Sequence, residues 1–379
     1  MTTPPLRRLP AILCCALVVA SCRSSDAPAA PQDDADAAGL RTYADFPIGG
    51  AIAIADVERD ERLREIIAAD FNSVTSTNDF KAYTIAAEPG ALDFSRADAT
   101  ARFAEANDLR LFGHALVWHA FSPEWIDALP PAETRDFLEA YIDTVVRRYR
   151  GRIDGWDVVN EAINTAGGGL RATNWRAKLG EDYMAEAFRL AHAADPDAKL
   201  FINDFNTERD TAKLSTLLET VAGLRQNGIP IHGIGFQMHI RVDTDTALVE
   251  RSLRRAAATG LLIHVSELDI SFNPHDDTRG GGVQAVAAMT PELLERQADQ
   301  YEAVARIYRR AVPAAQRYGI TFWDFTDRDS WIDGFFGVED WPTVYDDDLE
   351  RKPAWAGFRR GLESSRTSLP GAPDAPVSF

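Results

Sequence analysis

Short apolar stretches alternate with longer amphipathic ones along most of this sequence, and the alternation is repeated eight times between residues 46 and 363. The short stretches are rich in β-branched and aromatic residues, as buried strands are, whereas the longer ones have the apolar spacing of helices. Strands are expected at residues 51–55, 73–77, 111–118, 155–160, 200–204, 233–237, 263–268 and 320–325. Helices are expected at residues 62–70, 98–107, 133–149, 183–194, 212–227, 247–259, 291–310 and 354–363.

Eight strands, each followed by a helix, are the number needed for a single closed (β/α)8 TIM barrel, which is an α/β fold. An open doubly wound sheet would show the same alternation. However, no predicted strand is followed by the Gly-rich fingerprint of dinucleotide-binding sheets. Because a barrel of this kind commonly occupies about 250 residues or more as one domain, we predict a single catalytic domain at residues 46–364.

The N-terminal segment has the pattern of an export signal. Arg7 and Arg8 precede an apolar run at residues 11–20, and small residues lead up to Cys22. The run is too short for a stable membrane-spanning helix. Residues 1–22 resemble a bacterial lipoprotein signal, in which Cys22 becomes the lipidated first residue; an ordinary secretory signal cut nearby is the alternative. We therefore expect an exported protein that is lipid-anchored to the bacterial outer membrane or cell surface, or held in the periplasm.

Composition limits the rest of the chain. Residues 23–45 are rich in Ala, Pro and Asp and are predicted to be a disordered tether, and residues 365–379 are predicted to be a disordered tail. All three cysteines lie in the signal segment, so the domain can form no internal disulfide and offers no thiolate. The net charge of −18 argues against nucleic acid and anionic membrane surfaces as partners. The lipid anchor is then the only membrane contact that we expect.

Two of the predicted strands end in a glutamate. Asn160 and Glu161 close the strand at residues 155–160, and Glu267 lies near the end of the strand at residues 263–268. Barrels of this class place their chemistry at the C-terminal ends of the strands. Two carboxylates there are the minimum equipment for acid/base and nucleophilic catalysis on an acetal. The alternative is that both glutamates belong to ion pairs at the barrel mouth.

Polar and aromatic residues gather at the other predicted strand ends, which packing alone does not explain because unpaired polar groups are costly to bury. The residues expected to bind substrate are Asn78, Lys81, His114, Trp118, Asn160, Gln237, His239, Trp323 and Trp331. The tryptophans suit the apolar faces of sugar rings but could also be core residues. Read alone, His114 fits a hydrogen-bonded core histidine, and Lys81 could serve a lyase or aldolase if its pocket desolvated the amine.

No metal site is expected. The acidic loops at residues 275–277 and 346–348 could hold Ca²⁺, but neither has a recognised ligand spacing, and solvated loops explain them better.

In combination, the motifs resemble those of glycoside hydrolase family 10, the endo-β-1,4-xylanase family. The resemblance extends over nearly the whole domain. It is carried by FNSVT at residues 71–75, GHALVWH at 113–119, WDVVNEA at 156–162, NDFN at 203–206, GIGFQMH at 233–239, SELD at 266–269, TD at 326–327 and SW at 330–331. No single motif is decisive, but their order and spacing together are specific.

The resemblance implies roles for the matching residues. Glu161 would be the general acid/base and Glu267 the nucleophile, with net retention of anomeric configuration. Asn160 would bind the 2-hydroxyl of the sugar at the cleavage point, and His239 would hold Glu267 ionised. The further substrate contacts implied are Asn78, Lys81, His114 and Gln237 for the glycone sugars, and Trp323 and Trp331 for a hydrophobic wall.

Four positions depart from the family pattern. Thr77 stands where glutamate is usual, and Phe121 lies where a glutamine is expected; Asp324 replaces a glycine and Ile332 an arginine. Thr77 and Phe121 would both lie on the glycone side, where family members hydrogen-bond a xylose. Losing two such contacts while keeping the catalytic residues predicts the same chemistry on an altered glycone. That glycone would belong to a decorated or differently linked xylan, or to a shorter oligosaccharide.

The sequence therefore predicts a monomeric, retaining endo-β-1,4-glycanase that acts on a xylan-type polysaccharide. No cofactor is needed, because acetal hydrolysis of this kind uses only carboxylates. The alternative is a surface carbohydrate-binding lipoprotein with weak or no catalysis. Such a protein would have no need to keep Asn160, Glu161, His239 and Glu267 together.

Overall fold

The structure is a computed structural model that describes residues 38–363 apart from residues 166–167 and 276–280. The predicted signal segment with Cys22, most of the predicted tether and the predicted tail lie outside the described residues. Among the helices described, none is both long enough and apolar enough to span a bilayer.

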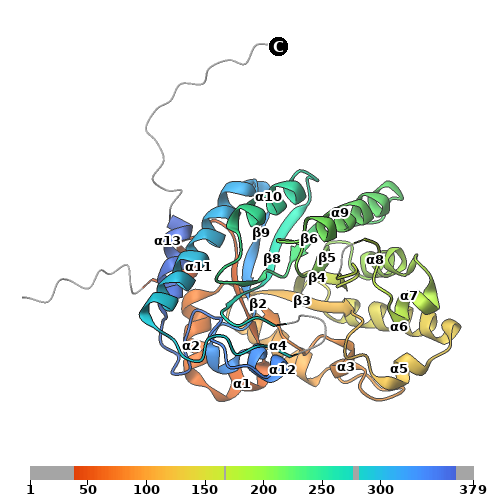
Figure 1. The fold of residues 1–379 in the computed structure, drawn as a ribbon. Coiled ribbons are helices and arrows are strands. Elements are labelled where there is room, and N and C mark those ends of the chain that lie inside the picture. Colours follow the sequence, from red (N-terminus) through yellow and green to blue (C-terminus); the bar gives the residue numbers. More distant parts are fainter. Residues whose placement is uncertain (1–37, 166–167, 276–280, 364–379) are drawn as a thin grey trace, which may run out of the picture. The chain divides into compact units, whose positions relative to one another are not determined.

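Parallel strands form a closed barrel at the centre of the domain (Figure 1). Eight strands complete the circle, since β1 pairs with both β2 and β9, and β6 pairs with β8. They are β1 (Ile48–Ile52), β2 (Ser73–Ser76), β3 (Arg110–Val117), β4 (Ile153–Asn160), β5 (Lys199–Asp204), β6 (Gly233–Phe236), β8 (Leu262–Ser271) and β9 (Arg317–Phe322). A short strand, β7 (His239–Arg241), follows β6 closely and also pairs with β8. The predicted (β/α)8 TIM barrel is confirmed.

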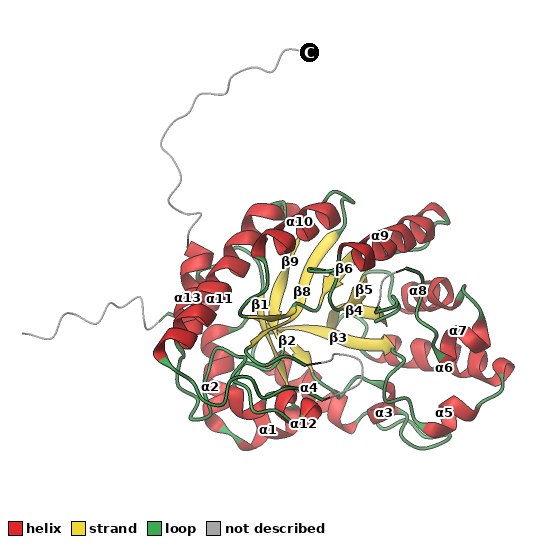
Figure 2. Cartoon of the chain, in the orientation of Figure 1, coloured by secondary structure: helices red, strands yellow, loops and turns green. Residues whose placement is uncertain are grey.

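Helices surround the strands (Figure 2). The longer ones match the eight predicted: α2 (Glu61–Asp70), α4 (Ser95–Ala106), α6 (Pro131–Arg148), α8 (Tyr183–Ala194), α9 (Thr211–Gln226), α10 (Thr246–Ala257), α11 (Pro291–Ala311) and α13 (Pro353–Glu363). Shorter helices that the sequence analysis did not foresee occupy the segments that follow strands: α1 (Ile54–Arg59), α3 (Ala82–Ile85), α5 (Glu124–Ala128), α7 (Asn174–Leu179) and α12 (Trp331–Phe336). These segments lie at the C-terminal ends of the strands, where the candidate site is.

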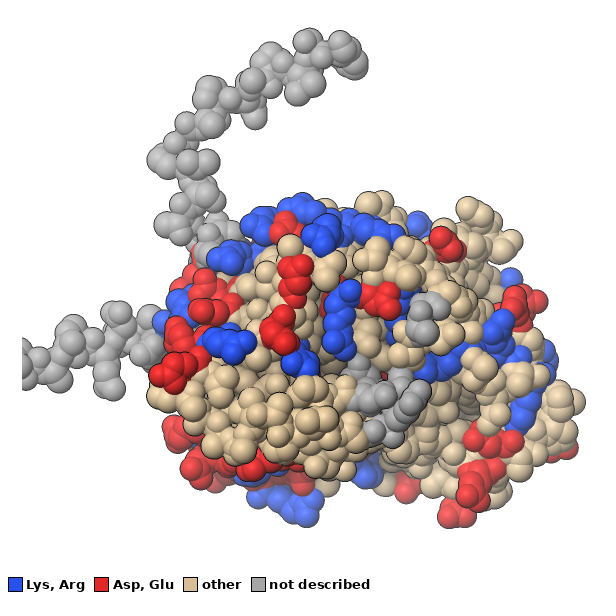
Figure 3. All heavy atoms as spheres, in the orientation of Figure 1, with Lys and Arg blue, Asp and Glu red and all other residues tan. Residues whose placement is uncertain are grey.

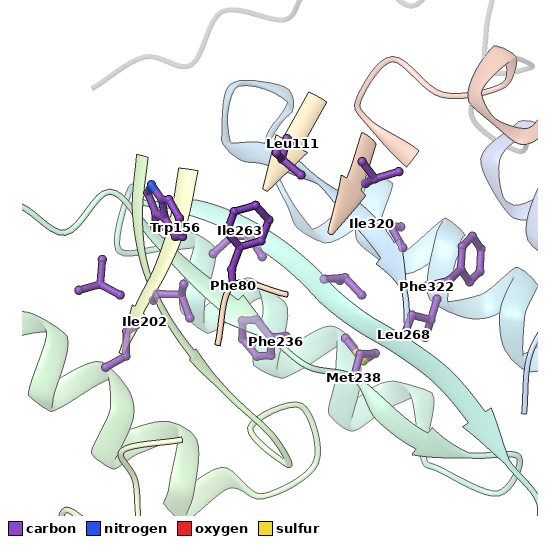
Figure 4. Packing of buried hydrophobic residues seen from close by; sticks show 14 of the residues in the cluster. Phe80, Leu111, Trp156, Ile202, Phe236, Met238, Ile263, Leu268, Ile320 and Phe322 are labelled. Carbon is purple, nitrogen blue, oxygen red and sulfur yellow. The ribbon is translucent and has the colours of Figure 1, made fainter. Parts of the chain in front are cut away.

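Two layers of buried side chains hold the barrel together. The larger layer lies between strands and helices, and Figure 4 shows part of it, including Trp156, Phe236 and Phe322. The smaller cluster contains Phe112, Phe201 and Tyr318. These three rings come from β3, β5 and β9, which are not neighbours, yet their centroids lie 4.5–5.6 Å apart. They must therefore meet inside the barrel, which is a packed core and not a pore.

The first strand was predicted with the wrong bounds. Residues 51–55 alternate between Ala and Ile and look like a strand. In the structure β1 ends at Ile52, and helix α1 begins at Ile54 with its face packed through Ile54 and Val57. So short an apolar stretch is compatible with the two-residue period of a strand and with the 3.6-residue period of a helix. Tertiary packing decides between them, and the helix begins at Ile54.

The prediction that residues 38–45 belong to a disordered tether is wrong. A 3-10 helix, η2 (Leu40–Thr42), forms there, and Leu40 is fully buried. The Leu40 amide donates to Asp70 Oδ1 at 3.1 Å. Asp45 pairs with Arg309 and Arg317 at 3.4 and 3.3 Å. A buried leucine and these polar contacts outweigh the compositional bias, so the folded domain begins before Phe46.

Acidic and basic side chains are interspersed with uncharged surface on the face drawn in Figure 3. Basic side chains gather over α10, at the top of the picture. There Arg254 pairs with Glu250 at 2.7 Å, and Arg310 of α11 also pairs with Glu250. These ion pairs partly neutralise the basic stretch.

Candidate active site

A cavity of about 950 Å³ lies at the C-terminal ends of the barrel strands. Both candidate catalytic glutamates and all nine predicted substrate-binding residues line it, namely Asn78, Lys81, His114, Trp118, Asn160, Glu161, Gln237, His239, Glu267, Trp323 and Trp331. They come from strand ends or from the loops that follow them. The barrel thus brings together side chains that the sequence separates by more than half of its length.

Glu161 follows β4 directly and is held in an uncommon backbone conformation. Its φ is 59°, in the left-handed region that a non-glycine residue adopts only at a cost of about 1–3 kcal/mol. The Glu161 amide donates to the Asn203 carbonyl at 2.8 Å, and Arg171 Nε donates to the Glu161 carbonyl at 2.8 Å. These bonds fix the backbone, so the carboxyl group is presented to the cavity and keeps some contact with solvent.

Glu267 is buried among donors. Asn203 Nδ2 donates to its Oε1 at 2.6 Å, and His239 Nε2 lies 3.3 Å from its Oε2. His114 Nδ1 lies 3.9 Å from Oε1. Burial alone would raise the pKa of Glu267, but the nearby His114 and the hydrogen bond and charge of His239 outweigh it and lower the pKa. Glu267 is therefore the carboxylate that stays ionised, as a nucleophile must.

His239 is itself held in the charged form. Its Nδ1 lies 2.7 Å from Asp269 Oδ2, and the same oxygen accepts a hydrogen bond from Trp331 Nε1 at 2.9 Å. Burial disfavours the charged ring, but Asp269 and Glu267 raise the pKa of His239 well above its usual value. As an imidazolium, His239 donates from both ring nitrogens. It therefore couples Glu267 to Asp269 and to the tryptophan wall.

Three side-chain amides connect the two glutamates. Asn203 Nδ2, besides its bond to Glu267, donates to Asn160 Oδ1 at 2.9 Å. Gln237 Nε2 lies 3.2 Å from the same Asn160 oxygen and 3.2 Å from Glu161 Oε1. Ordered amides of this kind fix the separation of the two carboxyl groups, which decides the stereochemical outcome of acetal hydrolysis.

The sequence around the amides makes room for them. A Cβ on Gly235 of β6 would lie 2.2 Å from Asn203 Oδ1, so only glycine fits beside that side chain. Ser266 Oγ donates to the same oxygen at 2.7 Å, which fixes which way the Asn203 amide points. Met238 has a φ of 64° between β6 and β7. This break in the strand lets both Gln237 and His239 line the cavity.

Lys81 lies between two aromatic rings. Its Nζ is 4.6 Å from the ring centre of Trp118 and 5.4 Å from that of Trp323. Burial lowers its pKa to about 8, although the charges of Glu267 and Glu161 oppose the shift. The desolvation that a lyase or aldolase would need is thus present, but with a pKa near 8 the amine is still mostly charged at neutral pH. A charged lysine between rings is suited to bind sugar hydroxyls.

Asp324 is a third carboxyl group in the cavity wall. It follows Trp323 with a φ of 51° and lines the same cavity. Burial and the neighbouring Asp329 and Asp269 carboxylates raise its pKa well above the usual value, against the opposing charge of Lys81. The raised pKa favours the protonated form of Asp324, and a protonated carboxyl group can donate a hydrogen bond.

One group of side chains in the described part of the chain has the composition of a metal site. His114, Asp157 and Glu267 each offer a ligand atom, and these atoms lie within 4.8 Å of one another. His114 Nδ1 already binds Asp157 Oδ2 at 2.8 Å, and both Glu267 oxygens have donors. These atoms thus already take part in hydrogen bonds within the site, although Asp157 Oδ1 is buried without a partner.

The site also includes two strand-end residues to which the sequence analysis gave no role. Asn203 bonds to Asn160 and Glu267, and Asp269 orients His239. Their positions already indicated the site, because Asn203 is at the end of a predicted strand and Asp269 lies two residues after Glu267, on the same side of β8. Phe335 and Tyr83 also line the cavity, but short helices carry them, and the sequence analysis predicted none there.

A closed barrel whose strand ends present a buried, ionised glutamate opposite a second glutamate, between tryptophan walls, defines a glycoside hydrolase. The model of Glycosyl hydrolase family 10 matches residues 40–360. The chain belongs to this family.

Similar proteins agree with this assignment. The chain is 35% identical over 346 residues to endo-1,4-beta-xylanase A of Cellvibrio japonicus, covering 86% of this chain and 56% of that protein. It is 36% identical over 323 residues to an endo-1,4-beta-xylanase of Geobacillus stearothermophilus, covering 82% and 94%. Native xylanase 10B from Thermotoga maritima superposes with a TM-score of 0.78 at 33% identity, over 86% of this chain and 98% of that one.

Proposed function

We propose that this protein is a retaining endo-β-1,4-glycanase that hydrolyses xylan-type hemicellulose by double displacement. The observation that carries the proposal is the different environment of the two glutamates. Glu267 is buried and held ionised by His239, His114 and Asn203. Glu161 is closer to solvent and receives only a side-chain amide bond from Gln237 at 3.2 Å and a longer one from Asn160. One carboxyl group is suited to attack, and the other to exchange protons.

The proposed reaction uses these two groups in sequence. In the first step, an oxygen of Glu267 attacks the anomeric carbon while the bond to the leaving oxygen breaks, and Glu161 gives its proton to that oxygen. In the second step, Glu161 removes a proton from water, whose oxygen attacks the anomeric carbon and releases Glu267. Two inversions give net retention. Asn160 lies where its amide can bind the 2-hydroxyl, and its orientation is set by Asn203 and Gln237.

A time-resolved proton NMR assay of the anomeric products tests the mechanism. A protein beginning at Ala38, without the predicted signal segment, should release the β-anomer first from linear xylooligosaccharides. Glu267→Ala should abolish this signal. Early release of the α-anomer would show an inverting mechanism and would refute the role of Glu267. Binding of xylan without any turnover by the wild type would instead favour a carbohydrate-binding lipoprotein.

The glycone preference is proposed to differ from that of the family. The Thr77 hydroxyl lies 3.3 Å from the Ile52 carbonyl, to which it donates, and so is directed to the backbone. Phe121 offers only an apolar ring, and 61% of this residue is exposed. Neither replaces a polar contact to a sugar, so a decorated or differently linked xylan is the proposed substrate. A clear preference for the undecorated linear chain, measured on linear, decorated and mixed-linkage xylooligosaccharides, would refute this proposal.

Export and anchoring are proposed from the N-terminal pattern alone. Lipidation at Cys22 would hold the monomeric enzyme at the outer membrane or cell surface, or in the periplasm, near its polysaccharide. Labelling with a palmitate analogue in a bacterial host should give a signal that Cys22→Ala abolishes. Equal labelling of both proteins would refute lipidation at this residue. Analytical ultracentrifugation of a protein that begins at Ala38 measures its mass in solution and so tests the proposed monomeric state.

A further inference from the structure

Two exposed phenylalanines meet at the rim of the cavity. Phe121 and Phe335 are 61% and 40% exposed, whereas nearly all other large hydrophobic side chains in the described part of the chain are covered. Their ring centres lie 6.4 Å apart, and the rings are nearly perpendicular, at 68°. Both line the same cavity as the catalytic glutamates. Two adjacent, exposed apolar rings at the mouth of a binding cavity commonly mark a recognition site.

Each phenylalanine prolongs a tryptophan wall outward. Phe121 lies just after Trp118 in the sequence, with ring centres 5.6 Å apart. Phe335 lies four residues after Trp331 on α12, so the two share one helix face, and their ring centres are 5.6 Å apart. The walls of the cavity therefore continue past the two tryptophans, and they meet at the two phenylalanines.

The Phe121 ring is held in place by its backbone and by a second aromatic neighbour. Phe121 has a φ of 53°, which is rare for a bulky residue, and its ring also contacts Tyr83 at 6.1 Å. Tyr83 in turn donates to Asn78 Oδ1. The strained backbone of Phe121 holds an apolar ring in contact with water, and burial of that ring therefore does little to offset the strain. Such a conformation indicates a functional constraint. In an edge-to-face pair the edge of one ring meets a face of the other, and the exposed fractions of Phe121 and Phe335 show that much of their ring surface remains available.

The same cavity extends past the ends of β1 and β2. Phe121 follows β3 and Phe335 follows β9, and in the barrel β1 and β2 lie between those two strands. There the cavity is lined by Ala53 and Asp56 at the start of α1. The Asp56 carboxylate lies at the surface, where its Oδ1 pairs with Arg59 Nη2 at 3.0 Å, and a carboxylate has further lone pairs that can accept hydrogen bonds from hydroxyl groups.

We propose that Phe121 and Phe335 form an outer sugar subsite, in which one neutral sugar ring of the substrate chain stacks at the end of the cleft on the side of Asn78 and Lys81. This inference rests on the proposed function. The occupant is a sugar because the walls that lead to the pair are aromatic and because the adjoining carboxylate suits hydroxyl groups. The ring faces supply the apolar contact, and Asp56 supplies the polar one.

The test compares short and long substrates. We expect Phe121→Ala and Phe335→Ala to lower kcat/KM on xylohexaose roughly five- to tenfold more than on xylotriose, because only the longer chain reaches the outer subsite. Phe121→Tyr keeps the ring and should restore the length dependence. Leu92→Ala is the matched control, since Leu92 is similarly exposed, at 39%, but does not line the cavity.

Two outcomes would overturn the subsite. Equal losses on both substrates would show that the phenylalanines only support the loops, and a gain on xylohexaose would show that they obstruct the cleft. Binding of the same two oligosaccharides to a Glu267→Gln protein, followed by calorimetry, gives a readout that needs no turnover. A wild type that cannot cleave xylooligosaccharides but binds the hexaose with the same dependence on Phe121 would refute the proposed function and support the subsite.

Discussion

Burial and neighbouring charge together set the pKa values of the carboxyl groups in the active site. At Glu267 the neighbours prevail, and the carboxylate stays ionised even though it is buried. At Asp324 burial and like charges act together and raise the pKa, which favours the protonated acid. Two carboxyl groups in one cavity thus have pKa values shifted in opposite directions, because their neighbouring charges and hydrogen bonds differ.

Replacing His239 tests the first of these effects. Without the imidazolium, His239→Asn should raise the pKa of Glu267, because a hydrogen bond and a positive charge are lost. The acidic limb of the kcat/KM profile should therefore move to higher pH, with an activity loss on the order of tenfold or more at acid pH. A pH–rate profile measures it. His192→Asn, outside the cavity lining, is the control; an unmoved limb would contradict the role of His239.

Replacing Asp324 tests the second effect through stability. Below about pH 3.8, its usual pKa, this carboxyl group is protonated in both folded and unfolded chains. As pH rises, the unfolded chain ionises while the folded one keeps its proton, so the wild type loses stability up to the raised pKa. Asp324→Asn avoids this loss and should be more stable by at least ~1 kcal/mol at neutral pH.

Urea unfolding at acid and neutral pH measures the difference. The exposed Asp197 gives the control variant Asp197→Asn, which should show no such pH-dependent gain. A gain for Asp324→Asn that is equal at both pH values would contradict a raised pKa at this position.

The sequence predicted the residues of the site better than their connections. Strand-end position was enough to select Glu161, Glu267 and His239, because the barrel collects strand ends in one place. It did not reveal that Asn203 bonds to both Glu267 and Asn160. That contact depends on the space left by Gly235 and on side-chain orientation, which hydrophobic periodicity does not encode.

At the scale of elements, β5 and α9 are joined by a buried ion pair, which also contacts the segment that follows β4. Lys213 Nζ lies 2.7 Å from Asp204 Oδ1, and both side chains are fully buried. Asp204 Oδ2 accepts a bond from the Ile163 amide at 2.9 Å, two residues after Glu161. The pair therefore links a helix on the outside of the barrel to the segment that carries Glu161, the proposed acid/base.

Removing the lysine should be costly. Lys213→Ala would leave the Asp204 carboxylate buried without its partner, and we expect a loss of about 3–5 kcal/mol in the free energy of unfolding. Urea denaturation measures it, with Lys199→Ala, an exposed lysine on β5, as the control. A loss for Lys213→Ala no larger than that of the control would show that the ion pair contributes little.

The elements themselves were largely predictable, since the long helices and six of the strands were placed close to their observed bounds, whereas β1 and β9 were each placed three residues too late. The short helices α1, α3, α5, α7 and α12 were missed. Helices of so few residues are not stable by propensity alone, and their formation depends on packing against the barrel. Because they carry Tyr83 and Phe335, the outer part of the site was the part least visible in the sequence.

At the scale of the whole domain, the two ends of the described chain meet at the buried Asp70, where α2 ends. Its Oδ1 accepts from the Leu40 amide at 3.1 Å, and its Oδ2 accepts from Tyr345 and Trp355, each at 2.6 Å. Arg351 Nη2 lies 3.4 Å away. One carboxylate thus fastens both the first segment and the last helix to the same point of the barrel.

The N-terminal boundary of the domain follows from this contact. A protein beginning at Phe46 would lose the burial of Leu40 and its bond to Asp70, which together stabilise the fold by ~3 kcal/mol. A protein beginning at Ala38 should keep both. We therefore expect a lower urea midpoint for the shorter protein, and Leu40→Ala in the longer one should reproduce most of the loss by removing a fully buried side chain. Equal midpoints for the two proteins would mean that residues 38–45 are only a tether, as their composition alone suggests.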